Sequence, residues 1–219
     1  GFFALEDVDL HAFEPRSVPM DVLLGKLRTQ KSKVIKQADV LMLVILLPGM
    51  FSTSEARTNF DYYEPLTGHG SSLSPGIHAT IAARLGRTET AYRYFQETAA
   101  IDLNDRMGNA AGGIHMAALG SLWQAAVFGF CGLTVNPDYL EISPDLPSSW
   151  RALTVPMKLR RRQLRIHVGV EAIVIRLETG EPLNILTSPR PECTLYSGDV
   201  LEIPLGDLPC QIWEAGIRT

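Results

Sequence analysis

The chain has 219 residues, of which 46% are hydrophobic and 20% are charged. This composition is typical of a globular protein with enough apolar residues to form a core. The formal net charge of −4 argues against a nucleic-acid-binding surface, which is usually basic. Three widely spaced cysteines without a CxxC pair, at positions 131, 193 and 210, predict free thiols rather than a disulfide framework or a zinc site.

The N-terminal sequence GFFALEDVDL is acidic and has no basic leader region. The longest apolar run, residues 40–47, is much shorter than the roughly 20 residues that a membrane-spanning helix needs. We therefore expect a cytoplasmic protein without a membrane segment. Because the chain opens without methionine, in sequence typical of the middle of a domain, we also expect it to be a fragment.

Helical patterns dominate the first part of the chain. Residues 38–47 are apolar on almost every side, which predicts a buried helix that ends at Pro48. In the next predicted helix, 74–86, Ser74 is the expected N-cap and Pro75 the first helical residue. Two further helices are predicted: residues 88–103 carry an amphipathic stripe, and residues 113–130 are rich in alanine and glycine.

After residue 137 the segments become short and rich in β-branched residues, with turn residues between them. We predict a C-terminal portion of a helical domain over 1–137 and a small antiparallel β domain over 138–219. Helices that are apolar on all sides need partners on several faces, so we expect the rest of the helical domain to lie upstream of Gly1. The predicted strands cover residues 154–159, 163–170, 171–178, 193–197 and 199–205.

Polar residues are concentrated just before these helices. Lys36 and Gln37 precede the apolar helix, where they suit sugar hydroxyls or an anion; an ordinary first helical turn explains them as well. Ser71 and Ser72 lie shortly before a helix N-terminus, which favours phosphate binding, although local capping is the alternative. His115 is expected in the first turn of another buried helix, as an anion ligand or as a core residue.

Other catalytic motifs are missing from the sequence. The histidines lack a metal-binding spacing such as HExxH, and no GxSxG, P-loop or dinucleotide motif occurs. Asp102 and Asp105 are more typical of solvated helix-end acids than of acid/base pairs. We expect neither a metal nor a cofactor.

Four segments, in order and with matching spacing, resemble glycoside hydrolase family 65, which includes maltose, trehalose, kojibiose and nigerose phosphorylases. They are VIKQADVLML (34–43), NFDYYEPLTGHGSSLSP (59–75), AYRYFQETAAIDLND (91–105) and GIHMAALGSLWQAAVFGF (113–130). The resemblance implies the last part of an (α/α)6 barrel followed by a small C-terminal β domain. It further implies an inverting reaction in which phosphate attacks the anomeric carbon and β-glucose 1-phosphate is released.

Carried over by motif, Lys36 and Gln37 would bind the donor sugar, and His115, Ser71 and Ser72 would bind phosphate. The family's general acid lies upstream of the KQAD motif, so no catalytic residue is expected within this chain. Disaccharide and inorganic phosphate are the expected partners, and a homodimer the expected assembly. The alternatives are a hydrolase of the trehalase or α-glucosidase type and, for the isolated chain, a non-catalytic carbohydrate-binding or structural module.

Overall fold

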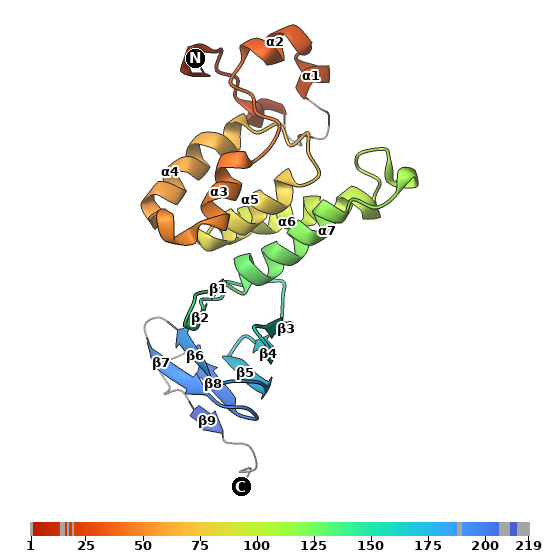
Figure 1. Cartoon of the computed structure of the whole chain (residues 1–219). Coiled ribbons are helices and arrows are strands. Elements are labelled where there is room, and N and C mark those ends of the chain that lie inside the picture. Colours follow the sequence, from red (N-terminus) through yellow and green to blue (C-terminus); the bar gives the residue numbers. More distant parts are fainter. Residues whose placement is uncertain are drawn as a thin grey trace. The chain divides into compact units, whose positions relative to one another are not determined.

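The computed structural model describes residues 2–13, 16, 18, 20–187, 190–205 and 211–213. Contacts divide the chain into two compact units, one ending at Gly129 and the other beginning at Phe130. The first unit is helical and the second is built of strands, as the sequence patterns predicted (Figure 1). The exact boundary at 137 and 138 stays a prediction. Within the described residues, no helix is both long and apolar enough to cross a membrane.

The helical unit contains helices α1 to α7, together with short 3-10 turns. Helix α7 continues into a π-helical turn at Ala125–Phe130. The predicted helices are confirmed, with α6 matching its predicted bounds. The bounds are α1 Met20–Leu23, α2 Lys26–Lys31, α3 Asp39–Leu46, α4 Thr53–Tyr63, α5 Ser74–Arg84, α6 Thr88–Leu103 and α7 Met116–Gln124.

Helix α5 lies at the centre of this unit, in contact with α3, α4, α6 and α7 (Figure 1). It is buried from Ser74 to Ala83, and small residues let its neighbours approach closely. At Gly76 the approach is closest, because a Cβ atom there would lie 2.1 Å from the Ser121 Oγ of α7. Gly76 therefore lets the backbone of α5 lie directly against Ser121 of α7.

The prediction that Ser74 caps α5 is wrong. Leu73 occupies the cap position and makes no side-chain cap, while Ser74 is the first helical residue. The Ser74 Oγ instead lies 3.0 Å from the Nδ1 of His69, so its hydroxyl serves a side chain rather than the backbone. His115 also differs from expectation, because it precedes α7 instead of lying in its first turn.

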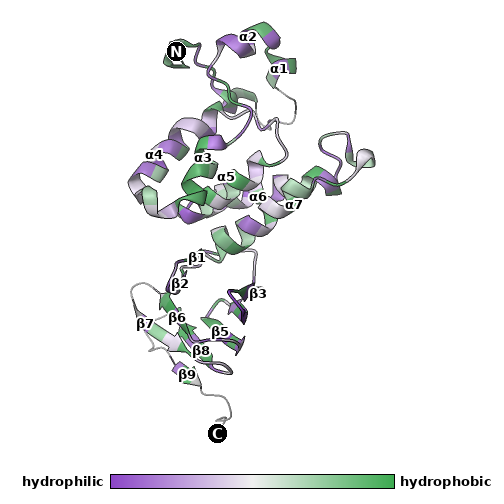
Figure 2. Cartoon of the chain, viewed as in Figure 1, coloured by the Kyte–Doolittle hydropathy of each residue, from purple (hydrophilic) through white to green (hydrophobic). Residues whose placement is uncertain are grey.

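Helix α3 is the most uniformly apolar element of the helical unit (Figure 2). Leu41 and Val44 are buried, whereas Leu43 and Leu46 are 46% and 64% exposed. The prediction of a helix buried all round therefore holds on one side of α3 only, within the described residues. The other side is an apolar surface that these residues leave uncovered.

The second unit consists of two sheets with the strand orders β1-β2-β6-β7 and β3-β4-β5-β8-β9. All pairings are antiparallel except that of β2 with β6, which is parallel. The five predicted strands are confirmed, and β1, β2, β6 and β9 were missed. The bounds are β1 Leu133–Val135, β2 Tyr139–Ile142, β3 Leu153–Leu159, β4 Arg162–Val168, β5 Ala172–Thr179, β6 Leu183–Thr187, β7 Arg190–Leu195, β8 Val200–Pro204 and β9 Gln211–Trp213.

Alternation along the strands produces the apolar core of this unit. In β4, Leu164, Ile166 and Val168 are buried while the residues between them are exposed. Ile175 of β5 is opposite Ile166 in the register and is fully buried. Because successive side chains point to opposite faces, each strand contributes every second residue to one core. This unit is held together by packing and contains few buried polar groups among its described residues.

Candidate functional site

The segment that carries Lys36 lies beside the segment that leads into α5. The Ile35 N–H donates to the carbonyl of Leu66 at 2.9 Å, and the Gly68 N–H donates to the carbonyl of Ile35 at 2.7 Å. These bonds form a parallel bridge between Ile35 and Thr67. Two motifs that are about thirty residues apart in sequence are thereby brought together by backbone hydrogen bonds.

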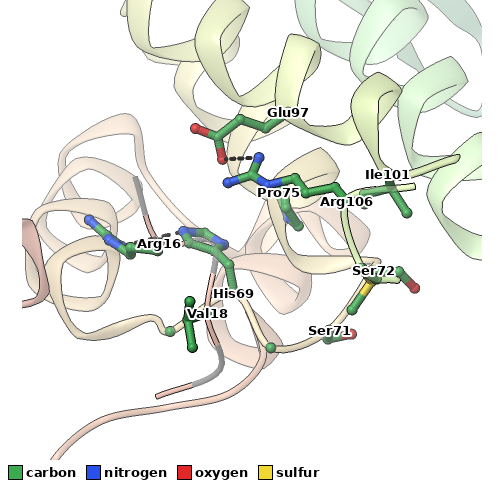
Figure 3. Close-up of a pocket in the computed structure, with 12 residues that line it drawn as sticks. Arg16, Val18, His69, Ser71, Ser72, Pro75, Glu97, Ile101 and Arg106 are labelled. Carbon is green, nitrogen blue, oxygen red and sulfur yellow. Dashed lines mark hydrogen bonds and ion pairs between the residues drawn. The ribbon is translucent and has the colours of Figure 1, made fainter. Parts of the chain in front are cut away.

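A pocket of about 120 Å³ opens where residues 69–72, the 69–72 loop, face the end of α6 (Figure 3). Ser71 and Ser72 line it from one side, and Arg106 reaches toward it from the segment after α6 (Figure 3). The side chains that surround it are rich in hydrogen-bond donors, which suits an anion or a polyol. This serine pocket is lined by Arg16, Val18, Gly68, His69, Gly70, Ser71, Ser72, Pro75, Glu97, Ile101, Arg106 and Met107.

Lys36 and Gln37 lie at the same loop without lining the serine pocket. A Cβ atom at Gly70 would be 3.3 Å from the Lys36 Cγ, so the lysine side chain runs along the 69–72 loop. Gln37 lines a separate shallow hollow together with Ser71. Both side chains are exposed. Four of the five predicted site residues thus gather around one loop.

His115 is held by Asp102, at the end of α6. The Asp102 carboxylate accepts from the His115 Nδ1 at 2.7 Å and from the His115 backbone N–H at 3.0 Å. The hydrogen bond from the His115 ring is the main reason why the pKa of Asp102 lies below its usual range. His115 is not among the described residues that line the serine pocket. Ile101, which precedes Asp102 in the sequence, does line it. A joint phosphate site of His115 with the two serines stays a prediction.

A buried carboxylate, Glu64, lies behind the serine pocket. Its Oε1 accepts from the Arg16 Nη2 at 3.2 Å and, in a short hydrogen bond, from the Tyr94 hydroxyl. Its Oε2 lies 3.2 Å from the His11 Nε2. Arg16, Glu64 and Tyr94 are all buried, and together with His11 they form the Glu64 cluster.

His69 connects the Glu64 cluster with the pocket. Its Nε2 lies 3.3 Å from the Tyr94 hydroxyl and 3.4 Å from the Arg16 Nη1. Burial, followed by the nearby His78 and Arg16, lowers the pKa of His69 well below its usual value. The ring is therefore neutral near pH 7 and can both donate and accept one hydrogen bond.

Burial has comparable effects on the neighbours of His69. It lowers the pKa of His78 to about 4, and this ring donates from Nδ1 to the Ser74 carbonyl at 2.9 Å. Burial and the Glu64 charge raise the pKa of Tyr94, so its hydroxyl keeps its proton. In the described parts of the chain, no group of three or more His, Cys, Asp or Glu side chains is arranged to hold a metal ion.

Two family profiles match successive parts of the chain. Residues 1–124 match the glycosyl hydrolase family 65 central catalytic domain, and residues 133–188 match the glycosyl hydrolase family 65 C-terminal domain. The chain belongs to glycosyl hydrolase family 65. In this family 65 chain the helices are thus part of the catalytic barrel and the strands are the C-terminal β domain, as the resemblance implied.

Relatives with known names agree with this assignment. The alpha,alpha-trehalose phosphorylase of Thermoanaerobacter brockii is 39% identical over 159 residues, which cover 73% of this chain and 20% of that protein. The kojibiose phosphorylase of Halothermothrix orenii is 44% identical over 144 residues, which cover 66% of this chain and 18% of that protein. The family 65 chain therefore spans about a fifth of the length of these curated relatives.

The solved structures include a match as well. A protein assigned as a kojibiose phosphorylase from the human microbiome matches with a TM-score of 0.82 and 30% sequence identity. The match covers 93% of the family 65 chain and 28% of that protein.

Sequence reasoning missed the residues that support the 69–72 loop. Arg16 and Glu64 are 48 positions apart, and Tyr94 lies a further 30 positions along the chain. Their hydrogen bonds have no local signature. His69 was visible beside the serines but had no assigned role, and only the contacts of its ring with Ser74, Tyr94 and Arg16 reveal one.

Proposed function

We propose that this chain is part of an inverting α-glucoside phosphorylase that releases β-glucose 1-phosphate. In this proposal the chain supplies contacts to the donor sugar and to phosphate, while the general acid comes from outside the chain. The observation that carries the proposal is the serine pocket, which Ser71 and Ser72 line together with Arg106 and His69. The named relatives, which are phosphorylases of trehalose and kojibiose, support the reaction class.

The pocket has the size and the chemistry that an inorganic phosphate requires. Its volume of about 120 Å³ accommodates a small tetrahedral anion. The serine hydroxyls donate hydrogen bonds, and the Arg106 guanidinium provides positive charge, although Glu97 at 3.3 Å partly balances it. Charge-assisted hydrogen bonds of this kind hold an attacking anion in line with the anomeric carbon.

The donor sugar is assigned to Lys36 and Gln37. Both side chains are exposed beside the 69–72 loop, so a sugar held by them would lie next to an anion in the serine pocket. Asp102 orients His115 through the ring Nδ1, which leaves the Nε2 atom as the atom available to a ligand. We include His115 as a further phosphate ligand on this basis. A cytoplasmic location and a homodimer are also part of the proposal.

Phosphate dependence of the full-length protein tests this function directly. We expect turnover of an α-linked glucose disaccharide only in the presence of phosphate, with β-glucose 1-phosphate as the first product observed by proton NMR. Equal turnover without phosphate would show that the protein is a hydrolase. Turnover by the 219-residue chain alone would contradict the assignment of the acid to another part of the protein.

The two serines provide a sharper test. Replacing Ser71 and Ser72 by alanine removes two phosphate donors, so we expect KM for phosphate to rise at least about tenfold per lost hydrogen bond. Steady-state kinetics at varied phosphate would measure this change. Ser54→Ala is the matched control, because Ser54 is exposed on α4. An unchanged phosphate KM in the double variant would exclude the serine pocket as the phosphate site.

A further inference from the structure

The Glu64 cluster determines the direction of each hydrogen bond between Glu64 and the 69–72 loop. A carboxylate that is paired with an arginine is ionised and can only accept hydrogen bonds. The Tyr94 hydroxyl must therefore donate its single hydrogen to the Glu64 Oε1. Once that hydrogen is used, the Tyr94 oxygen can act only as an acceptor toward the neighbouring His69.

The His69 Nε2 consequently carries the ring proton and donates it to the Tyr94 oxygen at 3.3 Å. Arg16 does not compete for this position, because its Nη1 donates to the carbonyls of Glu64 and Thr67, at 2.8 Å in each case. In the neutral ring the Nδ1 is then bare. It accepts a hydrogen bond from the Ser74 hydroxyl at 3.0 Å.

This chain of hydrogen bonds fixes a backbone conformation that would otherwise be unfavourable. His69 has a φ angle of 47°, in the left-handed region that non-glycine residues seldom occupy. Both nitrogens of its ring are held, one by Tyr94 of α6 and the other by Ser74 of α5. The Ser74 N–H also donates to the Ser71 carbonyl at 3.1 Å, which closes the loop onto α5.

The loop held in this way is the wall of the serine pocket. Gly70, Ser71 and Ser72 follow His69 directly, and all of them line the pocket. Figure 3 shows the two serines on this loop. In the other neutral tautomer the Ser74 hydroxyl could accept from a protonated Nδ1, but no hydrogen would lie between the bare Nε2 and the Tyr94 oxygen. The ring would then lose its hydrogen bond to α6, and we expect the 69–72 loop to be held less firmly.

We infer that Glu64 and Tyr94 are positioning residues which hold His69 in the Nε2-protonated tautomer and thereby set the shape of the 69–72 loop for an anion. Neither residue touches the pocket; both act through the His69 ring. The link to phosphate rests on the proposed function, whereas the tautomer and the loop conformation rest on the hydrogen-bond geometry and on the neutral state of the buried His69 ring.

The tautomer is tested by NMR of the chain labelled with nitrogen-15 in histidine. We expect the His69 signals, identified by their loss in His69→Gln, to show a protonated Nε2 and a bare Nδ1 near pH 7. Tyr94→Phe removes the acceptor and should give a mixture of tautomers. Tyr63→Phe, which removes a hydroxyl from the neighbouring α4, should leave the pattern unchanged. A protonated Nδ1 in the unsubstituted chain would overturn the inference even if the variant fails to fold.

The consequence for phosphate is tested in the full-length protein. We expect Tyr94→Phe to raise KM for phosphate about tenfold, the effect of one lost hydrogen bond, with little change in KM for the disaccharide. Phosphate-dependent turnover with an unchanged phosphate KM in this variant would overturn the positioning role while leaving the proposed function intact. Phosphate-independent turnover of the unsubstituted protein would instead overturn the proposed function, and the NMR result would then decide the tautomer by itself.

Discussion

The two units of this chain bury different kinds of side chain. Next to the serine pocket the helical unit buries Arg16, Glu64, Ser74 and His78, whereas the β unit buries alternating aliphatic residues such as Ile175. Burying a charged pair costs desolvation energy that well-packed apolar residues would avoid. We therefore interpret the buried charged pair of the helical unit as fixing the positions of the residues around it, at some cost in stability. The core of the β unit, in contrast, is stabilised by apolar packing.

Removing the centre of the polar interior should have the largest effect. Glu64→Ala leaves the Arg16 charge buried without its carboxylate, and we expect a loss of about 3–5 kcal/mol in the free energy of unfolding. Urea denaturation of the chain followed by circular dichroism would measure it. Glu89→Ala, at an exposed position on α6, is the control and should change stability by less than about 0.5 kcal/mol. If Glu64→Ala lowered the free energy of unfolding as little as Glu89→Ala does, the pairing of Glu64 with Arg16 would not be needed for stability.

Acid should weaken the polar interior next. The pKa of His78 is about 4 in the folded chain, below its ordinary value of 6.5, so protonation favours the unfolded state. This stabilisation is complete above pH 6.5 and is lost as the pH falls toward 4, by roughly 3 kcal/mol in total. Unfolding experiments at several pH values would detect the loss, and His78→Gln should reduce its slope. If the free energy of unfolding of this variant fell with pH as steeply as that of the original chain, groups other than His78 would be responsible for the loss.

The apolar core should respond least to a small change. Ile175→Val removes one methylene group from a fully buried position and should cost about 1 kcal/mol in the free energy of unfolding. Because no charge is involved, this cost should be the same at pH 7 and pH 5. A strong pH dependence would contradict the contrast between the two interiors. Denaturation of the variant and of the original chain at both pH values would measure it.

The same contrast explains how much the sequence could predict. Helix α6 and strand β4 carry their periodicity within a few consecutive residues, so their burial patterns could be expected in advance. Strands β1 and β9 are each three residues long, too short to show a pattern. Strand β6 alternates clearly in the structure, but it was overlooked in the sequence.

The candidate site was predictable only where its residues are close in sequence. Ser71 and Ser72 were identified from their place before a helix start, and the structure puts them in a pocket. The contacts of Glu64 with Arg16 and Tyr94 depend on three segments meeting in space, which no local pattern encodes. Ser74 shows a different limit, because a capping rule assigned its hydroxyl to the backbone, whereas its partner is the ring of His69, five positions earlier in the sequence.

Like α3, helix α7 has apolar side chains that the described residues leave exposed, and this has a practical consequence. Met116, Leu119 and Trp123 form a stripe at helical spacing and are 70%, 43% and 49% exposed, while Ala118 and Ser121 face the interior. An indole in contact with water fluoresces at longer wavelengths than one in a dry interface. Trp123 is therefore a built-in optical reporter: when another protein segment covers this stripe, its emission will shift toward the blue.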